Sequence, residues 1–127
     1  MKIAVLIARI LLGLVFFVLG LNGFLQFLKM GPLPSGLAGQ FVAVLIQSHY
    51  VLFVSAIQVA GGALLLMNRY VPLALTLLGP VIVNILLYHA LMDPPGIGPG
   101  VVVTILWGFL AFRNRQHFAG LFVQRTS

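Results

Sequence analysis

The sequence predicts an all-α integral membrane protein: a bundle of four membrane-spanning helices with a short interfacial or re-entrant helix between the first and second spans. Its 127 residues are 61% hydrophobic and only 6% charged, and the mean hydropathy is +1.17. Roughly a quarter of the residues in a soluble domain are charged, so lipid must replace water around most of this surface. The length suits a single membrane domain, residues 1–127.

The first span is expected at about residues 3–28. Its unbroken apolar stretch, residues 10–21, would cover ~18 Å as a helix. A signal peptide is the alternative because Lys2 precedes an apolar region, but Arg9 interrupts that region and no Ala-x-Ala site follows. Arg9 either extends to the inner interface or finds a buried partner, such as an amide or a backbone carbonyl freed by Pro80.

The next apolar region, residues 37–67, is too long for one span. As a single helix it would measure ~45 Å, against a hydrocarbon core of ~30 Å. The polar sequence QSHY divides it into a short interfacial or re-entrant helix at about 37–47 and a second span at about 50–67. The preceding sequence KMGPLPSGLAG supplies the helix breakers that separate this region from the first span.

The third span is expected at about 71–92 and the fourth at about 99–112. Pro72 suits the first turn of the third span, and DPPGIGPG ends that span. Pro80 removes one helical hydrogen bond and predicts a kink in the third span. The fourth span is short, so it either thins the bilayer or continues into the tail, residues 113–127, whose arginines would then extend to the headgroups.

The basic residues predict the orientation in the membrane. Four spans place six of the seven Lys and Arg residues on or near one side and leave Lys29 opposite. The six are Lys2, Arg9, Arg69, Arg113, Arg115 and Arg125. By the positive-inside rule, both termini are then cytoplasmic. These residues form no basic run, so a nucleic-acid partner is not expected, and the lipid bilayer is the surrounding phase.

Polar side chains within the spans gather at one depth, in the half of the membrane away from the termini. Asn84 and Tyr88 lie one helical turn apart and share a ridge, whereas Gln58 lies near the middle of the second span. Amides cannot face lipid without cost, so they must meet one another, a cavity or a ligand. They either line a ligand pocket or bond across helices as packing contacts worth about 0.6 kcal/mol each. The candidate ligand-binding residues are Asn22, Gln26, Gln58, Asn84, Tyr88 and His89.

His89 and Asp93, the only acidic residue, are separated by one helical turn. The pair is either a proton relay with His89 as a general base, or a helix cap and a turn former before PPG. His49 and His89 suggest the alternative that two helices hold a haem or a metal ion, but no metal-ligand spacing supports a metal site. One acid excludes paired-carboxylate chemistry, and the absence of cysteine excludes thiol chemistry, so whether the chain is an enzyme stays open.

Three segments carry a family resemblance. They are ARILLGLVFFVLGLNGF in the first span, AIQVAGGALLLMNRYVPLALTLLGPVIVNILLYH across the second and third, and the short terminal helix. The most specific features are Arg9, the glycine-rich end of the first span, and the pair Gly61 and Gly62 followed by Arg69. These segments resemble the DoxX-like family of small four-helix bacterial membrane proteins.

The resemblance implies a four-helix bundle in a bacterial inner membrane. It also implies a link to redox functions, such as a thiosulfate-oxidising, quinone-reducing subunit or an oxidative-stress membrane complex. Relatives that use cysteine pairs are no guide, because this chain has no cysteine. Any electron transfer would therefore depend on a bound cofactor or a partner protein.

Two functions from different classes follow from these observations. The first is a membrane protein that binds a lipophilic small molecule such as a quinone, or supports a membrane redox complex, through the outer-half polar pocket. The second is a non-catalytic subunit or scaffold, assembled with a partner protein or with copies of itself, whose polar residues serve helix packing. A proton-coupled transporter is a third alternative, and four short spans would have to oligomerise to form its pathway.

Overall fold

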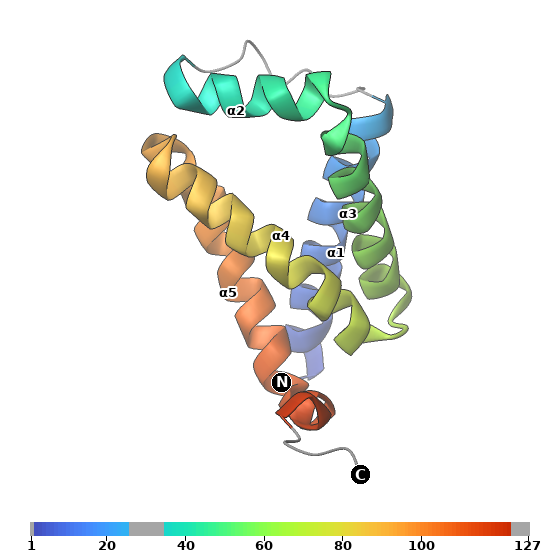
Figure 1. Ribbon diagram of the computed structural model, residues 1–127. Coiled ribbons are helices and arrows are strands. Elements are labelled where there is room, and N and C mark those ends of the chain that lie inside the picture. Colours follow the sequence, from blue (N-terminus) through green and yellow to red (C-terminus); the bar gives the residue numbers. More distant parts are fainter. Residues whose placement is uncertain (1, 26–34, 123–127) are drawn as a thin grey trace.

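The computed structural model describes residues 2–25 and 35–122, and no strand occurs within these ranges. Gln26, a predicted site residue, lies outside the described residues. So does Lys29, which the sequence places on the side of the membrane opposite the other basic residues. The elements in chain order are α1 (Lys2–Leu25), α2 (Gly36–Gln47), α3 (Tyr50–Met67), α4 (Val71–Leu91), the 3₁₀ turn η1 (Pro94–Gly96), α5 (Ile97–Arg113) and the 3₁₀ segment η2 (Arg115–Phe122) (Figure 1).

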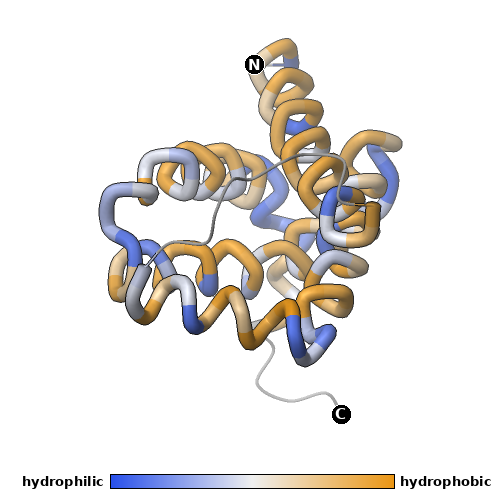
Figure 2. Tube along the Cα trace, turned by 90° about the horizontal axis from the view of Figure 1, so that it is seen from above, coloured by the Kyte–Doolittle hydropathy of each residue, from blue (hydrophilic) through white to orange (hydrophobic). Residues whose placement is uncertain are grey.

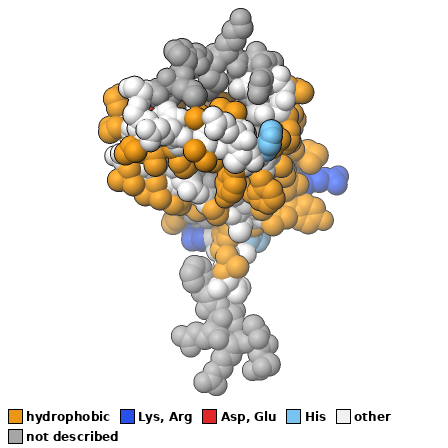
Figure 3. Space-filling model, turned by 45° about the horizontal axis from the view of Figure 1, so that its top comes forward, with side chains coloured by type: hydrophobic (Ala, Val, Ile, Leu, Met, Phe, Trp, Pro, Cys, Tyr) orange, Lys and Arg blue, Asp and Glu red, His pale blue; other side chains and the backbone are white. Residues whose placement is uncertain are grey.

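The fold class predicted from the sequence is confirmed. Four segments of the described chain are long and apolar enough to cross a membrane, and α2 is a shorter apolar helix between the first and the second. The four segments are Lys2–Leu25, Tyr50–Met67, Val71–Leu91 and Pro94–Arg113. Hydrophobic residues run along most of each helix (Figure 2), and they cover much of the described part of the face in Figure 3. Large apolar side chains are exposed on all five helices, as an integral membrane protein requires.

The last span begins earlier than expected. The turn η1 leads directly into α5 at Ile97, and Pro99 lies in the first turn of that helix rather than at its start. The first four N–H groups of a helix have no acceptor within the helix, so a proline there removes no hydrogen bond. Together η1 and α5 give an apolar segment of 20 residues, which is long enough to span.

The four spanning helices pack in a ring. Helix α1 contacts α3, α3 contacts α4, α4 contacts α5, and α5 contacts α1. Helix α2 lies across one end of this ring and contacts α3 (Figure 1). The start of α1, the α3–α4 turn and the end of α5 lie toward the opposite end. We call these two ends of the molecule the α2 end and the turn end.

The buried core joins all four spanning helices. Lipid is as apolar as a leucine side chain, so these residues stabilise the bundle through close van der Waals contact rather than through removal from water. The largest fully buried side chains are Leu12 and Phe16 on α1, Leu65 on α3, Leu75 and Leu78 on α4, and Leu110 on α5.

Glycines allow α1 and α3 to approach backbone to backbone. A Cβ atom on Gly62 of α3 would lie 2.5 Å from the nitrogen of Phe17 and 2.8 Å from the carbonyl oxygen of Gly13. A Cβ atom on Gly20 would lie 2.8 Å from the carbonyl oxygen of Ser55. Small residues at such contacts are the usual device for close helix packing in membranes. The neighbouring Gly61 faces α4 instead, where a Cβ atom would meet Leu78 at 2.7 Å.

Arg9 joins α1 to the end of α3. Its Nη1 donates to the backbone carbonyl of Leu65 and, at 3.3 Å, to that of Leu66. Carbonyls in the last turn of a helix lack the regular helical donor, and the negative end of the helix dipole attracts a cation. Of the expected alternatives, Arg9 therefore has a backbone carbonyl partner. The end of α3 supplies the carbonyls, and Pro80 does not.

Candidate functional site

A cavity of about 800 Å³ lies between α2, α3 and α4. Helices α3 and α4 are joined by a short turn and diverge from there toward α2, which crosses the space between them (Figure 1). The cavity forms where the two helices have separated. Its volume lies within the range of about 300–1,000 Å³ that is typical of small-molecule sites.

Helix α4 presents a ridge of four residues to this cavity. Thr76, Pro80, Asn84 and Tyr88 follow one another at intervals of one helical turn, and all four line the cavity. His89 lies on the adjacent ridge, beside Tyr88. Polar side chains therefore lie along the same wall as apolar ones, from the middle of the span to its end at α2.

The walls from α3 and α2 are mainly apolar. Helix α3 contributes the polar side chains of Tyr50 and Gln58, and it also places Phe53 and Ile57 in the wall. From α2, the ring of Phe41 lies with its centroid 5.6 Å from that of Tyr88, in a tilted arrangement. Tyr88 in turn meets His89 edge to face at 4.9 Å. These ring contacts fix how the phenol lies at the α2 end of the cavity.

The hydrogen bonds of α4 fix one amide and leave acceptors available. Asn84 donates through Nδ2 to the carbonyl of Pro80 at 2.9 Å, which leaves its Oδ1 as an acceptor. Pro80 has no N–H to offer the carbonyl of Thr76 one turn earlier. The Thr76 hydroxyl donates to the carbonyl of Pro72 at 2.9 Å. The wall therefore carries oxygen acceptors at the level of the proline.

Gln58 and Tyr88 differ from Asn84 in their hydrogen bonding. Both side chains are half-buried and line the cavity, and neither forms a hydrogen bond to another residue within 2–25 and 35–122. The Gln58 amide offers two donors and an acceptor, and the Tyr88 hydroxyl offers one donor and can also accept. In an apolar setting such groups are stabilised by any ligand that carries a complementary oxygen or hydroxyl.

His89 is held by the residue at the end of its own helix. Its Nδ1 lies 3.2 Å from the backbone carbonyl of Asp93 and 3.7 Å from the Asp93 carboxylate oxygen Oδ2. Gly96 of η1 packs closely here, because a Cβ atom at that position would lie 2.9 Å from Cε1 of His89. A proton on Nδ1 satisfies the carbonyl and leaves Nε2 as an acceptor. This geometry serves either a helix cap or a relay.

The predicted site residues fall into three groups. Gln58, Asn84, Tyr88 and His89 line the one cavity, and Asp93 lies beside His89. Asn22 is half-buried on α1 and does not line this cavity. Gln26 lies outside the described residues.

The sequence interpretation missed several cavity residues, among them Thr76 and Phe41. Thr76 continues the Asn84 and Tyr88 ridge toward the turn end, and its spacing of eight residues from Asn84 could have shown this. Phe41 meets Tyr88 only because α2 folds back over the bundle, and no periodicity within either helix predicts that contact. In the described part of the chain, no three His, Cys, Asp or Glu side chains gather as a metal site would require.

The fold and this cavity define the class of protein: a multi-pass α-helical membrane protein with a small-molecule-sized cavity between three of its helices. Comparison with protein-family models gives no match, and comparisons with curated proteins and with solved structures give no significant match.

Proposed function

We propose that this membrane protein binds a lipophilic small molecule with a polar head group, of the quinone class, in the cavity between α2, α3 and α4. One observation carries the proposal: Gln58 and Tyr88 line a largely apolar cavity without a hydrogen-bond partner among the described residues. A quinone has an apolar ring and tail that suit the walls, and carbonyl oxygens that accept from an amide or a phenol.

The DoxX-like resemblance supports a role beside a membrane redox complex, and that role belongs to the same proposal. Without cysteine in the chain, electrons would reach a bound quinone from a partner protein. His89 and Asp93 lie next to Tyr88, where a proton could be delivered to a reduced quinone oxygen. The proposed setting is a bacterial inner membrane with the turn end in the cytoplasm, which the six-to-one distribution of basic residues supports.

The test measures quinone binding directly. The protein is purified in detergent, organic extracts are searched by mass spectrometry for co-purified quinone or lipid, and decylubiquinone is titrated against the protein. Gln58→Leu and Tyr88→Phe should each raise the Kd about fivefold, the effect of losing one hydrogen bond of about 1 kcal/mol. Gln40→Leu is the matched control, because Gln40 is exposed on α2 and does not line the cavity. Absence of decylubiquinone binding, or equal weakening by all three variants, would refute the proposal.

A second candidate is a non-catalytic scaffold, and the local bond of Asn84 favours it. Its Nδ2 donates to the Pro80 carbonyl of its own helix, as expected of a polar residue with a structural role. Separate substitution of Asn22, Gln58, Asn84 and His89 distinguishes the two functions. A scaffold loses stability in every variant, whereas a binding site loses decylubiquinone affinity at the cavity residues with stability kept.

A further inference from the structure

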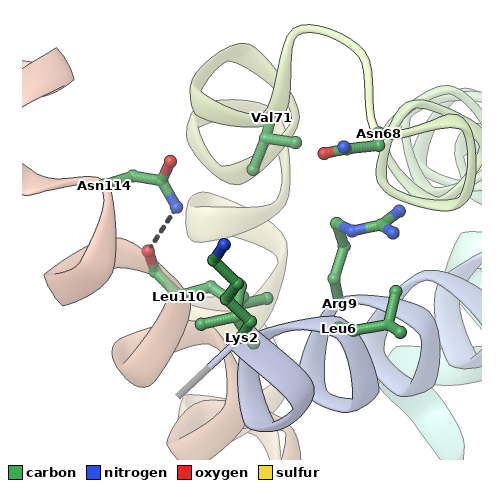
Figure 4. Close-up of a pocket in the computed structure, with 8 residues that line it drawn as sticks. Lys2, Leu6, Arg9, Asn68, Val71, Leu110 and Asn114 are labelled. Carbon is green, nitrogen blue, oxygen red and sulfur yellow. Dashed lines mark hydrogen bonds between the residues drawn. The ribbon is translucent and has the colours of Figure 1, made fainter.

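A second cavity, of about 240 Å³, lies at the turn end, 
between the start of α1, the α3–α4 turn and the end of α5 (Figure 4). Its polar lining consists of Lys2, Arg9, Asn68 and Asn114. Figure 4 shows these four side chains around one space, although they come from three separate parts of the chain. Apolar side chains, among them Leu6, complete the lining.

Helix periodicity and two caps place the polar groups. Lys2 and Arg9 are seven residues apart, so they lie on one face of α1, two turns from each other. Asn68 ends α3 in the left-handed conformation, with φ 54°. Asn114 follows α5, and its Nδ2 donates to the carbonyl of Leu110 at 2.8 Å. The amides are therefore held by the ends of helices, and the cations by one helix face.

The two cations have donors left over. Arg9 uses Nη1 for the carbonyls at the end of α3, and a guanidinium has five N–H donors in all. The Lys2 ammonium forms no hydrogen bond or ion pair with any residue in the described ranges. An additional acceptor at this cavity would satisfy both groups.

The sequence has no acidic side chain to supply here. Asp93 is its only acidic residue among seven Lys and Arg, and Asp93 lies beside His89 at the other end of α4. An acidic side chain of this sequence therefore cannot supply the counter-charge for Lys2 and Arg9, whereas an anion from another molecule can. Because the cavity lies at the ends of membrane-spanning helices, the phosphates of lipid headgroups are the anions present at that level.

We propose that this cavity binds the phosphate of an anionic phospholipid from the leaflet at the turn end. Lys2 and Arg9 supply the charge, and Asn68 and Asn114 supply amide groups beside the phosphate. Leu6 belongs to the lining and is 45% exposed on the outside of α1, where it offers apolar surface to an acyl chain. This site is separate from the proposed quinone cavity, and neither depends on the other.

Two matched pairs of variants test the proposal by native mass spectrometry of the full chain in detergent. Lys2→Gln removes a cation from the cavity, and Arg113→Gln removes one at the same end outside it. Asn68→Asp adds a carboxylate inside the cavity with almost no change of shape, and Gln116→Glu adds one at an exposed position nearby. Dioleoyl phosphatidylglycerol, dioleoyl phosphatidylcholine and glycerol phosphate are titrated against each. Thermal unfolding verifies that each variant is folded.

The expected result is a preference for phosphatidylglycerol over phosphatidylcholine that the cavity variants reduce. Lys2→Gln and Asn68→Asp should each raise the Kd for phosphatidylglycerol about tenfold, and the two control variants less than about threefold. If Lys2→Gln does not fold, Asn68→Asp alone decides. If the cavity variant and the control variant of either pair raise the Kd equally, the preference for phosphatidylglycerol comes from the overall charge at this end rather than from the cavity, and the proposal is overturned. Glycerol phosphate that displaces the lipid at equal concentration would make a free anion the ligand and overturn it too.

Discussion

Substitution of Gly62 by alanine tests whether the α1–α3 contact depends on the absence of a side chain. The added Cβ atom would lie 2.5 Å from the nitrogen and 2.9 Å from the Cα atom of Phe17, and 2.8 Å from the oxygen of Gly13. All three are backbone atoms, which cannot rotate away. Ordinary contact begins at about 3.4 Å, so the two helices must move apart by roughly 1 Å.

Two opposing terms set the size of the effect. Overpacking of this kind costs about 1–3 kcal/mol, while replacing glycine by alanine in a helix returns up to about 1 kcal/mol. Gly62→Ala should therefore lower the free energy of unfolding by about 1–2 kcal/mol. Gly108→Ala is the matched control on α5, because a Cβ atom there has nothing within 4 Å. It keeps only the helix term and should raise the free energy of unfolding by up to about 1 kcal/mol.

Reversible unfolding in mixed micelles of increasing SDS content measures both variants against the original chain. Helix content is followed by far-UV circular dichroism. The two variants should lie on opposite sides of the original, about 1–3 kcal/mol apart, because the overpacking term is what separates them. If Gly62→Ala is as stable as Gly108→Ala, the backbone contact between α1 and α3 is not what holds these helices together.

Two further predictions concern the basic residues and the orientation. Arg9→Met should lower the free energy of unfolding by about 1–3 kcal/mol, because the end of α3 loses a charged donor. Arg115→Met is the control and should change the free energy of unfolding by less than about 0.5 kcal/mol, because the hydrogen bond from Arg115 to the Phe112 carbonyl is exposed. Similar losses for both variants in the same SDS titration would show that Arg9 only extends to the interface. The chain has no cysteine, so Gln47→Cys at the α2 end and Gln116→Cys at the turn end each carry one label site. An impermeant thiol reagent should label Gln47→Cys in intact cells and Gln116→Cys only after permeabilisation. The reverse pattern would show that the orientation in the membrane is opposite to the proposed one.

The spans could be predicted from the sequence because hydropathy and helix length are local properties. The break between α2 and α3 could also be predicted, because one helix over both would be too long for the membrane. In the structure the chain turns there at His49, which has the left-handed conformation with φ 63°. The start of α5 could not be fixed to the residue, because Pro99 is acceptable anywhere in the first turn. A backbone carbonyl was among the expected partners of Arg9, but its place at the end of α3 could not be predicted, since it depends on the register of α1 against α3 that the glycine contact sets.

For the cavity, the sequence predicts which residues of one helix share a face, but not which helix faces meet. Asn84, Tyr88 and His89 share α4, so their spacing shows that they lie on adjacent ridges. Whether Gln58 or Asn22 faces that wall depends on how α3 and α1 are rotated about their axes, which a single sequence does not specify. The structure turns Gln58 into the cavity and leaves Asn22 out of its lining.

The distribution of charge that predicts the orientation of the chain also makes the two cavities differ in chemistry. The cavity near α2 is lined by no Lys or Arg among the described residues, and its polar groups are neutral amides, hydroxyls and a histidine. The cavity at the turn end is lined by two cations, and the only acid of the chain lies at the far end of α4. In the proposed orientation, the charge that would keep the turn end on the cytoplasmic side during insertion is also the charge that would attract an anion there afterwards. The cavity near α2, whose lining within residues 2–25 and 35–122 holds no Lys or Arg, suits a neutral lipophilic ligand, because no ion has to be desolvated for it to enter.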